Sequence, residues 1–260
     1  MTQDERLDYL LRTLLAEQPG RYTGMKLPCG VADRRHLLRA LFNLRPPIPA
    51  DKTFLCIQDR YLQEDLRLRG ITRLPAPGAY RNGFFLWRGD ITTLAADGIV
   101  NAANSGLIGC FYPCHGCIDN AIHTRAGVQL RLACAELMRR QRREEPAGKA
   151  KITPAFNLPS SFVLYTVGPA VRGQPTARER WPLASCYRAC LDLAVQSCLR
   201  SIAFCCISTG EYHFPGEQAA QIAVNAVRNH SAVKNDEIKV IFNVFSSRDE
   251  ALYKNLLGTA

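Results

Sequence analysis

The sequence predicts an α/β fold in which helices cover both faces of a sheet, preceded by a helical segment. From about residue 83 onward, strand candidates alternate with helix candidates. The later strand candidates are continuous apolar runs, which is typical of strands buried on both faces. Before residue 75, in contrast, leucines recur at helical spacing.

The first 75 residues predict a helical extension of three helices. Leucines recur at helical spacing over residues 7–15 and 37–44, and Pro46-Pro47 stops the second run. A third helix is predicted over residues 51–69, and the Pro- and Gly-rich residues 74–78 are typical of a linker. We therefore expect residues 1–75 to pack on a main domain over residues 80–260, or on a partner.

The main domain is predicted by the order of its apolar segments. Short apolar runs closed by polar residues predict strands, and apolar residues recurring three or four positions apart predict helices. The predicted strands cover residues 84–87, 98–103, 162–167, 201–207 and 238–245, and the predicted helices cover residues 119–141, 178–199, 216–229 and 249–257.

Composition predicts a globular chain with reduced thiols. The chain has 260 residues, of which 47% are hydrophobic and 22% are charged. No apolar run reaches the roughly 18 residues that a membrane span needs, and the mixed charges of residues 1–6 do not resemble a signal peptide, so we expect a cytoplasmic protein. The cysteine count of 11 is odd and several cysteines lie in apolar runs, which argues against a disulfide framework.

The net charge of +10 raises the possibility of a nucleic-acid partner. The basic residues are scattered, however, except in the run over 139–143, which two glutamates follow and no aromatic residue interrupts. This run is more typical of a solvated helix end, which argues against nucleic acid. A basic surface equally favours a phosphate-bearing ligand or an acidic partner.

Two loops that link a strand to a helix carry the candidate site. The first runs from Asn101 to Asn120, and the second covers residues 207–216. Backbone amides at a helix N-terminus bind phosphate groups, and small residues let a ligand approach the backbone. Two such loops can hold one diphosphate from both sides. In the second loop the candidate ligand-binding residues are Ser208, Thr209, Gly210, Glu211 and Tyr212.

The first loop also predicts a metal site. Cys110, His115 and Cys117 offer two thiolates and an imidazole, a set that suits one Zn²⁺ per chain. Three protein ligands leave a position open for water or substrate, as in catalytic zinc sites. Two alternatives stay open: Cys114 as a fourth ligand, which would make the site structural, and a reduced loop without metal.

Asp119 and His123 are candidate catalytic residues beside this loop. They lie four residues apart on one face of the predicted helix and could position or activate a water. Each also has a structural interpretation, since Asp119 could simply cap the helix and a lone histidine on a helix is often structural.

Several segments resemble motifs of the macrodomain, a fold that binds ADP-ribose. They are residues 89–92 (Gly-Asp-Ile-Thr), 100–104 (Val-Asn-Ala-Ala-Asn), 118–123 (Ile-Asp-Asn-Ala-Ile-His), 165–169 (Tyr-Thr-Val-Gly-Pro), 207–210 (Ile-Ser-Thr-Gly) and 244–245 (Val-Phe). The resemblance implies a three-layer α/β/α domain with a mixed central sheet. It also implies that Asp90, next to Ile91, receives the adenine amino group, that Phe245 lies by the adenine, and that Asn104 contacts the ribose beside the scissile bond.

One departure from the family pattern is specific. Hydrolytic macrodomains ordinarily carry a run of glycines before the aspartate, whereas this chain carries residues 110–117 there. Together with the helical extension, this resembles the zinc-dependent branch, which hydrolyses the bond between ADP-ribose and a protein side chain, typically an acidic one. The resemblance implies removal of mono-ADP-ribose, and for some members a link to a sirtuin-type ADP-ribosyltransferase and a lipoyl-carrier protein. Either the zinc or Asp119 would drive the chemistry, and the alternative function is a module that binds ADP-ribose without cleaving it.

Overall fold

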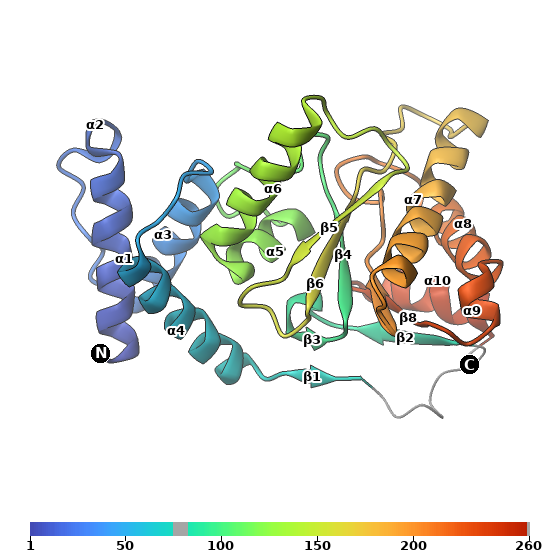
Figure 1. Cartoon of the computed structure of the whole chain (residues 1–260), viewed down its shortest axis with the longest axis horizontal. Helices are drawn as coiled ribbons and strands as arrows, with labels where there is room; N and C mark the ends of the chain where they lie inside the picture. The colour runs from blue at the N-terminus through green and yellow to red at the C-terminus, as the bar shows by residue number, and fades with distance from the viewer. Residues whose placement is uncertain (75–82, 259–260) are drawn as a thin grey trace.

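The computed structural model describes residues 1–74 and 83–258, whose arrangement Figure 1 shows. Except for Leu74, the predicted linker over 74–78 lies outside the described residues, and so do residues 80 and 260, the predicted ends of the main domain. The helices are α1 (Gln3–Glu17), α2 (Pro19–Tyr22), α3 (Val31–Leu44), α4 (Lys52–Arg69), the 3-10 helix η2 (Ile91–Thr93), α5 (Ile118–Ala126), α6 (Val128–Gln141), α7 (Ala177–Gln196), α8 (Gly216–Arg228), α9 (Ser231–Lys234) and α10 (Ser247–Leu257). The strands are β1 (Thr72–Arg73), β2 (Phe84–Arg88), β3 (Leu94–Ala95), β4 (Gly98–Ala102), β5 (Ala150–Pro154), β6 (Phe162–Thr166), β7 (Ser201–Phe204) and β8 (Lys239–Val244).

Helices α1, α3 and α4 pack around a hydrophobic cluster of their own. The periodic leucines that predict α1 supply it, since Leu7, Leu10 and Leu11 are at most 1% exposed. Helix α3 ends at Leu44, directly before Arg45 and the predicted stop at Pro46. The extension is therefore helical where the sequence predicts helices.

The central sheet is mixed. Among the described residues it has six strands in the order β2-β8-β7-β4-β6-β5. Strand β5 pairs with β6 in the antiparallel sense, and the other neighbouring pairs are parallel. The predicted mixed sheet is thus confirmed, and its five parallel strands share one carboxyl edge.

Helices lie on both sides of this sheet. In Figure 1, α5 and α6 lie between the sheet and the N-terminal helices, whereas α7, α8 and α10 lie on the other side. The strands between them are buried: Ile99 of β4, Leu164 of β6, Ile202 of β7 and Ile241 of β8 are all 0% exposed. The apolar runs therefore form strands covered on both faces, as the sequence predicts.

The N-terminal helices contact the rest of the molecule directly. Gln58 of α4 accepts a hydrogen bond of 2.9 Å from the Val128 N–H and donates one of 2.7 Å to Gln129 Oε1. The side chain of Val128 belongs to the hydrophobic cluster of the N-terminal helices. The short strand β1, which follows α4, pairs in parallel with β3.

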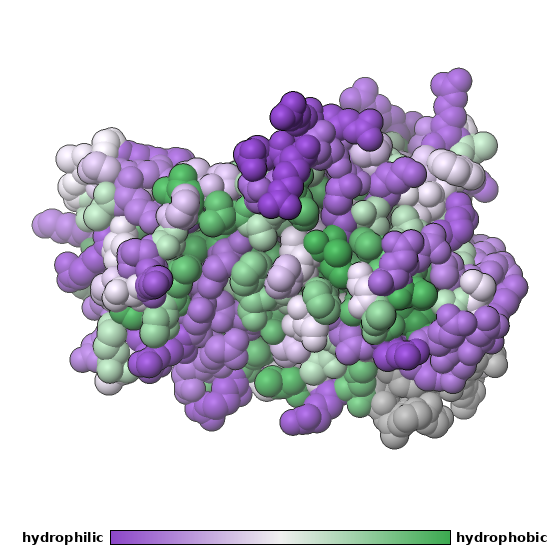
Figure 2. All heavy atoms as spheres, viewed as in Figure 1, coloured by the Kyte–Doolittle hydropathy of each residue, from purple (hydrophilic) through white to green (hydrophobic). Residues whose placement is uncertain are grey.

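The arginine run at the end of α6 is solvated, as predicted. The side chains of Arg139 and Arg140 are 73% and 71% exposed, and both pair with Glu136. Figure 2 shows a strongly hydrophilic projection over this end of α6. None of the described helices is both long and apolar enough to cross a membrane.

Besides several short elements that the sequence does not predict, two longer elements differ from the sequence prediction. The helix predicted over 119–141 is divided into α5 and α6, because Gly127 has a φ of +94° and a Cβ there would lie 2.6 Å from Gln58 Nε2. The sequence predicts no strand over residues 150–154, yet β5 forms there. This strand lies at the sheet edge, contains Lys151 and ends at Pro154, so it lacks the apolar pattern of a buried strand.

Candidate active site

The two loops singled out by the sequence leave neighbouring strands at one edge of the sheet. Strands β4 and β7 are adjacent and parallel, so their carboxyl ends, Ala102 and Phe204, lie at the same edge. The first loop, residues 103–117, leads to α5, and the second loop, residues 205–215, leads to α8. Because open α/β sheets bind ligands at this edge, both loops are placed to line one site.

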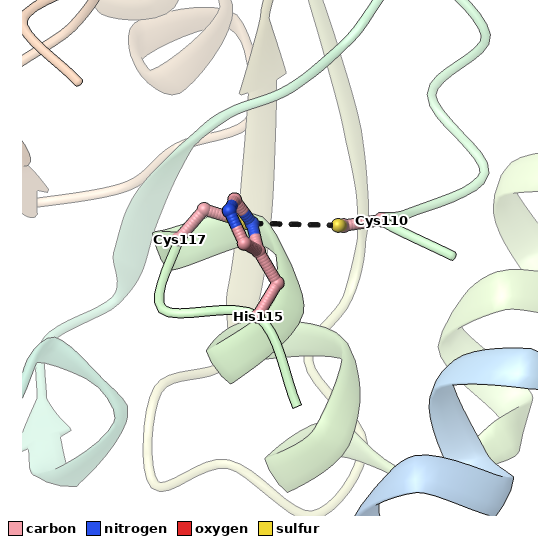
Figure 3. A group of neighbouring side chains, drawn as sticks. All are labelled: Cys110, His115 and Cys117. Carbon is pink, nitrogen blue, oxygen red and sulfur yellow. Dashed lines mark hydrogen bonds between the residues drawn. The ribbon is translucent and has the colours of Figure 1, made fainter. Parts of the chain in front are cut away.

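Cys110, His115 and Cys117 lie together in the first loop. Their ligand atoms are all within 4.8 Å of one another, and Cys110 Sγ lies 3.7 Å from His115 Nδ1. Figure 3 shows Cys110 approaching His115 from one side of the loop and Cys117 from the other. In a tetrahedral zinc site with bonds of about 2.0–2.3 Å, ligand atoms are roughly 3.5 Å apart. The donor types and their spacing therefore fit zinc.

Cys114 points away from this cluster. Its Sγ lies 3.5 Å from the carbonyl oxygen of His36 on α3, and its backbone has a φ of +55°. Among the described residues, the group that could hold a metal contains Cys110, His115 and Cys117 without Cys114. This geometry favours the three-ligand set.

Asp119 is held between two asparagine amides. Asn101 Nδ2 donates to Asp119 Oδ1 at 2.7 Å, and Asn104 Nδ2 donates to Asp119 Oδ2 at 3.5 Å. Burial raises the pKa of Asp119 to about 6, although the hydrogen bond from Asn101 and the charge of Arg131 both lower it. A carboxyl group with a pKa near the working pH suits general base chemistry.

Helix capping does not explain Asp119. The N-cap of α5 is Cys117, whose Sγ accepts a hydrogen bond of 3.4 Å from the Asn120 N–H. Asp119 lies two residues further on, with its carboxylate bonded to the asparagine side chains. The alternative in which Asp119 is only a cap is therefore wrong.

His123 lies beneath Asp119, inside the protein. Its Nε2 is 3.4 Å from Asp119 Oδ1, yet neither ring nitrogen has a hydrogen-bond partner among the described residues. Burial, together with the smaller effect of the charge of Arg131, lowers its pKa to about 3. The imidazole packs closely against Gly109, where a Cβ would lie 2.9 Å from the ring. His123 is thus a neutral, buried neighbour of Asp119 rather than a group at the surface.

The second loop folds on itself and lies against the end of β6. Ser208 has a φ of +67°, and its hydroxyl is buried without a hydrogen-bond partner among the described residues. Thr209 donates its hydroxyl to the Cys206 carbonyl at 2.9 Å, and Gly210 is exposed. A Cβ at Gly168 would lie 1.9 Å from Ser208 Oγ, so only glycine allows this close approach.

Glu211 and Tyr212 link the second loop to its surroundings. Glu211 Oε1 lies 3.4 Å from His115 Nε2, so the carboxylate faces the imidazole of the first loop. The Tyr212 carbonyl accepts a hydrogen bond of 2.8 Å from the Val171 N–H. A carboxylate beside a ligating histidine orients the ring in many metal sites.

The predicted adenine residues lie at the other end of this edge. Arg88 of β2 pairs with Val244 of β8, so Asp90 and Phe245 leave adjacent strands. Phe245 is 84% exposed, and the carboxylate of Asp90 accepts a hydrogen bond of 3.1 Å from Arg69 of α4. The side chain of Ile91 is different, because it is 4% exposed and packs in the core.

Sequence reasoning assigns no role to two residues of this site. Asn101 is 0% exposed and orients Asp119; the sequence marks it as a polar residue inside an apolar strand and as part of the 100–104 segment, but not as a partner of Asp119. Arg131 of α6 donates to the Cys110 carbonyl at 3.4 Å, and its guanidinium lies 4.1 Å from the ring centroid of Phe111. Nothing in the local pattern of α6 marks Arg131, because its partner Cys110 lies 21 residues away along the chain and its partners Asn43 and Arg45 lie 88 and 86 residues away.

Comparison with known proteins agrees with this arrangement. A family model described as Macro domain matches residues 100–223. A protein-ADP-ribose hydrolase of Treponema medium is 54% identical over 262 residues, which span 99% of this chain and 100% of the relative. A protein-ADP-ribose hydrolase of Staphylococcus aureus strain MRSA252 is 46% identical over 254 residues, spanning 96% of this chain and 94% of the relative.

A solved structure with the same fold includes a ligand. The Trypanosoma brucei macrodomain in complex with ADP-ribose superposes with a TM-score of 0.62 at 28% identity, covering 84% of this chain and 95% of that chain. The mixed sheet with helices on both sides is therefore a macrodomain fold, as the motifs predict. Identity over nearly the full length of two hydrolases shows that the chain belongs to the macrodomain family of protein-ADP-ribose hydrolases.

Proposed function

We propose that this protein removes mono-ADP-ribose from modified protein side chains and that the hydrolysis depends on zinc. Family membership supports the removal of ADP-ribose. One observation in this chain carries the zinc part: the thiol and imidazole cluster of Cys110, His115 and Cys117 lies in the loop that precedes the buried carboxylate of Asp119. A protein that only binds ADP-ribose needs neither feature.

The ligand is proposed to lie along the carboxyl edge of the sheet. Its adenine would lie near Asp90 and Phe245, and its diphosphate between the loops at residues 105–119 and 208–212. The buried Ser208 hydroxyl, which lacks a partner among the described residues, is a donor that a phosphate oxygen could satisfy. The remaining ribose then reaches Asn104 and the metal cluster.

Each residue around the scissile bond has a separate role in the proposed reaction. Asn104 orients the ribose, and Asp119, oriented by Asn101, takes the proton of the attacking water. His123 stays neutral beneath Asp119 and shapes the environment of the carboxylate. Zinc, held by Cys110, His115 and Cys117, would supply a Lewis acid beside the distal ribose.

An ester to aspartate or glutamate is the bond that best suits this site. A carboxylate leaves as a stable anion at neutral pH and needs no proton, whereas an amine or guanidine must be protonated as it leaves. Asp119 is suited to accept a proton, and His123 is buried with its pKa lowered to about 3, so it is a poor donor to a leaving group. The substrates proposed are therefore proteins modified on acidic side chains.

The decisive experiment measures free ADP-ribose released from a mono-ADP-ribosylated protein by the purified chain. Release should stop when a chelator removes zinc and should return when Zn²⁺ is restored. Full release by the folded, metal-free protein would contradict the zinc dependence and leave Asp119 as the main catalytic group. Tight binding of ADP-ribose without any release from the zinc-loaded protein would indicate a binding module instead.

The linkage is tested with substrates that differ only in the modified residue. A protein modified on glutamate should be cleaved, and the same protein modified on arginine should not. A lipoyl-carrier protein modified by a sirtuin-type ADP-ribosyltransferase belongs in this set, since the resemblance implies that pair as partners. Equal cleavage of the glutamate and arginine substrates would contradict the ester preference.

A further inference from the structure

The loop that contains Cys110, His115 and Cys117 is held by a helix of the N-terminal extension. Arg39 of α3 donates from Nη2 to the His115 carbonyl at 2.7 Å and to Asn120 Oδ1 at 2.8 Å, and from Nε to the same Oδ1 at 3.1 Å. His115 is a candidate ligand, and Asn120 lies three residues after Cys117. One guanidinium therefore fixes the backbone of the loop and the start of α5 at once.

A second residue of α3 holds the same loop one turn further along. Asn43 is 1% exposed; its Oδ1 accepts a hydrogen bond of 2.9 Å from the Cys114 N–H, and its Nδ2 donates one of 3.0 Å to Thr124 Oγ1. Cys114 has a φ of +55°, a conformation that most residues avoid, so its geometry depends on such a partner. The hydrogen bond to Asn43 therefore fixes the position of Cys114, the residue directly before His115.

Helix α3 is a rigid support for these contacts. Arg45, at its end, is 3% exposed on its side chain and forms two hydrogen bonds of 2.8 Å with Glu17 of α1. Arg131 of α6 donates bonds of 2.6 Å to the carbonyls of Asn43 and Arg45. The end of α3 is thus fixed from both the extension and the α/β part.

The loop itself has no regular structure between Cys110 and Cys117. Within residues 110–117 the backbone hydrogen bond that the structure describes is the one from the His115 N–H to the Tyr112 carbonyl, at 3.2 Å. A loop with so little internal bonding requires outside contacts to keep its three ligand atoms close together.

We propose that Arg39 and Asn43 are positioning residues of the zinc site, and that the N-terminal helices are consequently part of the metal-binding unit. The inference rests on the proposed function, because it assumes that Cys110, His115 and Cys117 bind zinc. Neither residue touches the ligand atoms; each holds the backbone that carries them. Loss of such outer contacts typically weakens metal binding about 10- to 100-fold.

The test measures zinc affinity on the full chain by competition with a chelating dye. Arg39→Gln should bind zinc about 10- to 100-fold more weakly than the unmodified protein. Arg34→Gln is the matched control: Arg34 is also a partly buried arginine of α3, but it bonds to Asp8 of α1 and not to the loop. The control should keep the unmodified zinc affinity, which separates loop positioning from general weakening of the helical extension.

Cobalt supplies a second readout that activity does not influence. In the Co²⁺-substituted protein the thiolate-to-cobalt absorption reports the ligand geometry, and Arg39→Gln should change this spectrum while Arg34→Gln does not. If Arg39→Gln fails to fold, Arg39→Lys replaces it, because lysine keeps the charge but cannot form the forked set of bonds. Equal zinc affinity and an equal cobalt spectrum in the folded Arg39 variant would overturn the inference. Absence of zinc binding by the unmodified protein would instead overturn the proposed function.

Discussion

Asn101 and Asp119 form a buried hydrogen bond of 2.7 Å in the candidate active site, from Nδ2 to Oδ1. The bond links the end of β4 to the start of α5, so the orientation of the carboxylate is fixed by the sheet. Because the donor occupies Oδ1, the other oxygen, Oδ2, faces Asn104.

Asp119→Asn should abolish most of the hydrolysis while preserving the fold. A positioned general base typically contributes about 10²- to 10⁴-fold to a rate, and an amide cannot accept the proton. Single-turnover release of ADP-ribose should fall by this factor, and the affinity for free ADP-ribose measured by calorimetry should change little. A variant that still cleaves at the unmodified rate would remove Asp119 from the chemistry.

His123→Ala should reduce the activity only in part, because His123 acts through the Asp119 carboxylate. His123→Asn allows a sharper prediction, which concerns the stability of the fold in acid. The pKa of His123 is lowered to about 3 in the fold, whereas the exposed side chain titrates near 6.5. Between these values the unfolded chain binds a proton that the folded chain does not, so the free energy of unfolding falls as the pH falls.

This contribution to the free energy of unfolding amounts to about 2 kcal/mol between pH 7 and pH 5. The raised pKa of Asp119 acts in the opposite direction, but its causes are burial, Asn101 and Arg131, which His123→Asn leaves in place, so it cancels from the comparison of the two proteins. The stability difference between the unmodified protein and His123→Asn should therefore shrink by about 2 kcal/mol over this range in urea titrations. A difference that is independent of pH would show that His123 is not kept neutral by burial.

His115→Ala should lose zinc without unfolding the domain. Residues 110–117 lie outside the main hydrophobic core, and a catalytic metal contributes to activity more than to stability. Metal content by mass spectrometry should fall well below one zinc per chain, the melting temperature should remain close to that of the unmodified protein, and release of ADP-ribose should stop. Collapse of the melting temperature together with zinc loss would indicate a structural site.

Asp90→Ala should weaken the binding of ADP-ribose, because its carboxylate is the predicted acceptor for the adenine amino group. Loss of a hydrogen bond to a charged group costs about 1.5–3 kcal/mol, which corresponds to roughly 10- to 150-fold in affinity. Asp192→Ala is a suitable control, since Asp192 is 62% exposed near the end of α7 that leads into the amino end of β7. Calorimetry that finds equal affinities for both variants would place the adenine elsewhere.

The sequence predicts the buried strands and the closeness of Cys110, His115 and Cys117 well, for a common physical reason. Strands β6, β7 and β8 are continuous apolar runs because both of their faces are covered, and Cys110, His115 and Cys117 are close in space because one short loop contains them. In both cases the information is local. The split between α5 and α6 is missed because the apolar spacing continues through Gly127, and the side chain that leaves no room for a Cβ there, Gln58 of α4, lies far away in the sequence.

The residues that hold the site in place cannot be predicted from local sequence patterns. Arg39 and Asn120 are 81 residues apart, and on its own helix Arg39 fits the pattern of a solvated face. The roles of Asn101 and Arg131 likewise depend on hydrogen bonds to partners on other elements. Periodicity predicts which face of an element is buried, but it does not predict which polar group a neighbouring element will present there.

The close approach of Gly168 to Ser208 has a consequence for which residue can occupy position 168. A Cβ there would lie 1.9 Å from Ser208 Oγ and 2.9 Å from Ile207 Cγ2, so any larger residue would force these side chains to move. Ser208 Oγ is also the buried hydroxyl that lacks a hydrogen-bond partner among the described residues. A position without a side chain, after a different strand, thus leaves room for the one hydroxyl that the proposed phosphate contact uses.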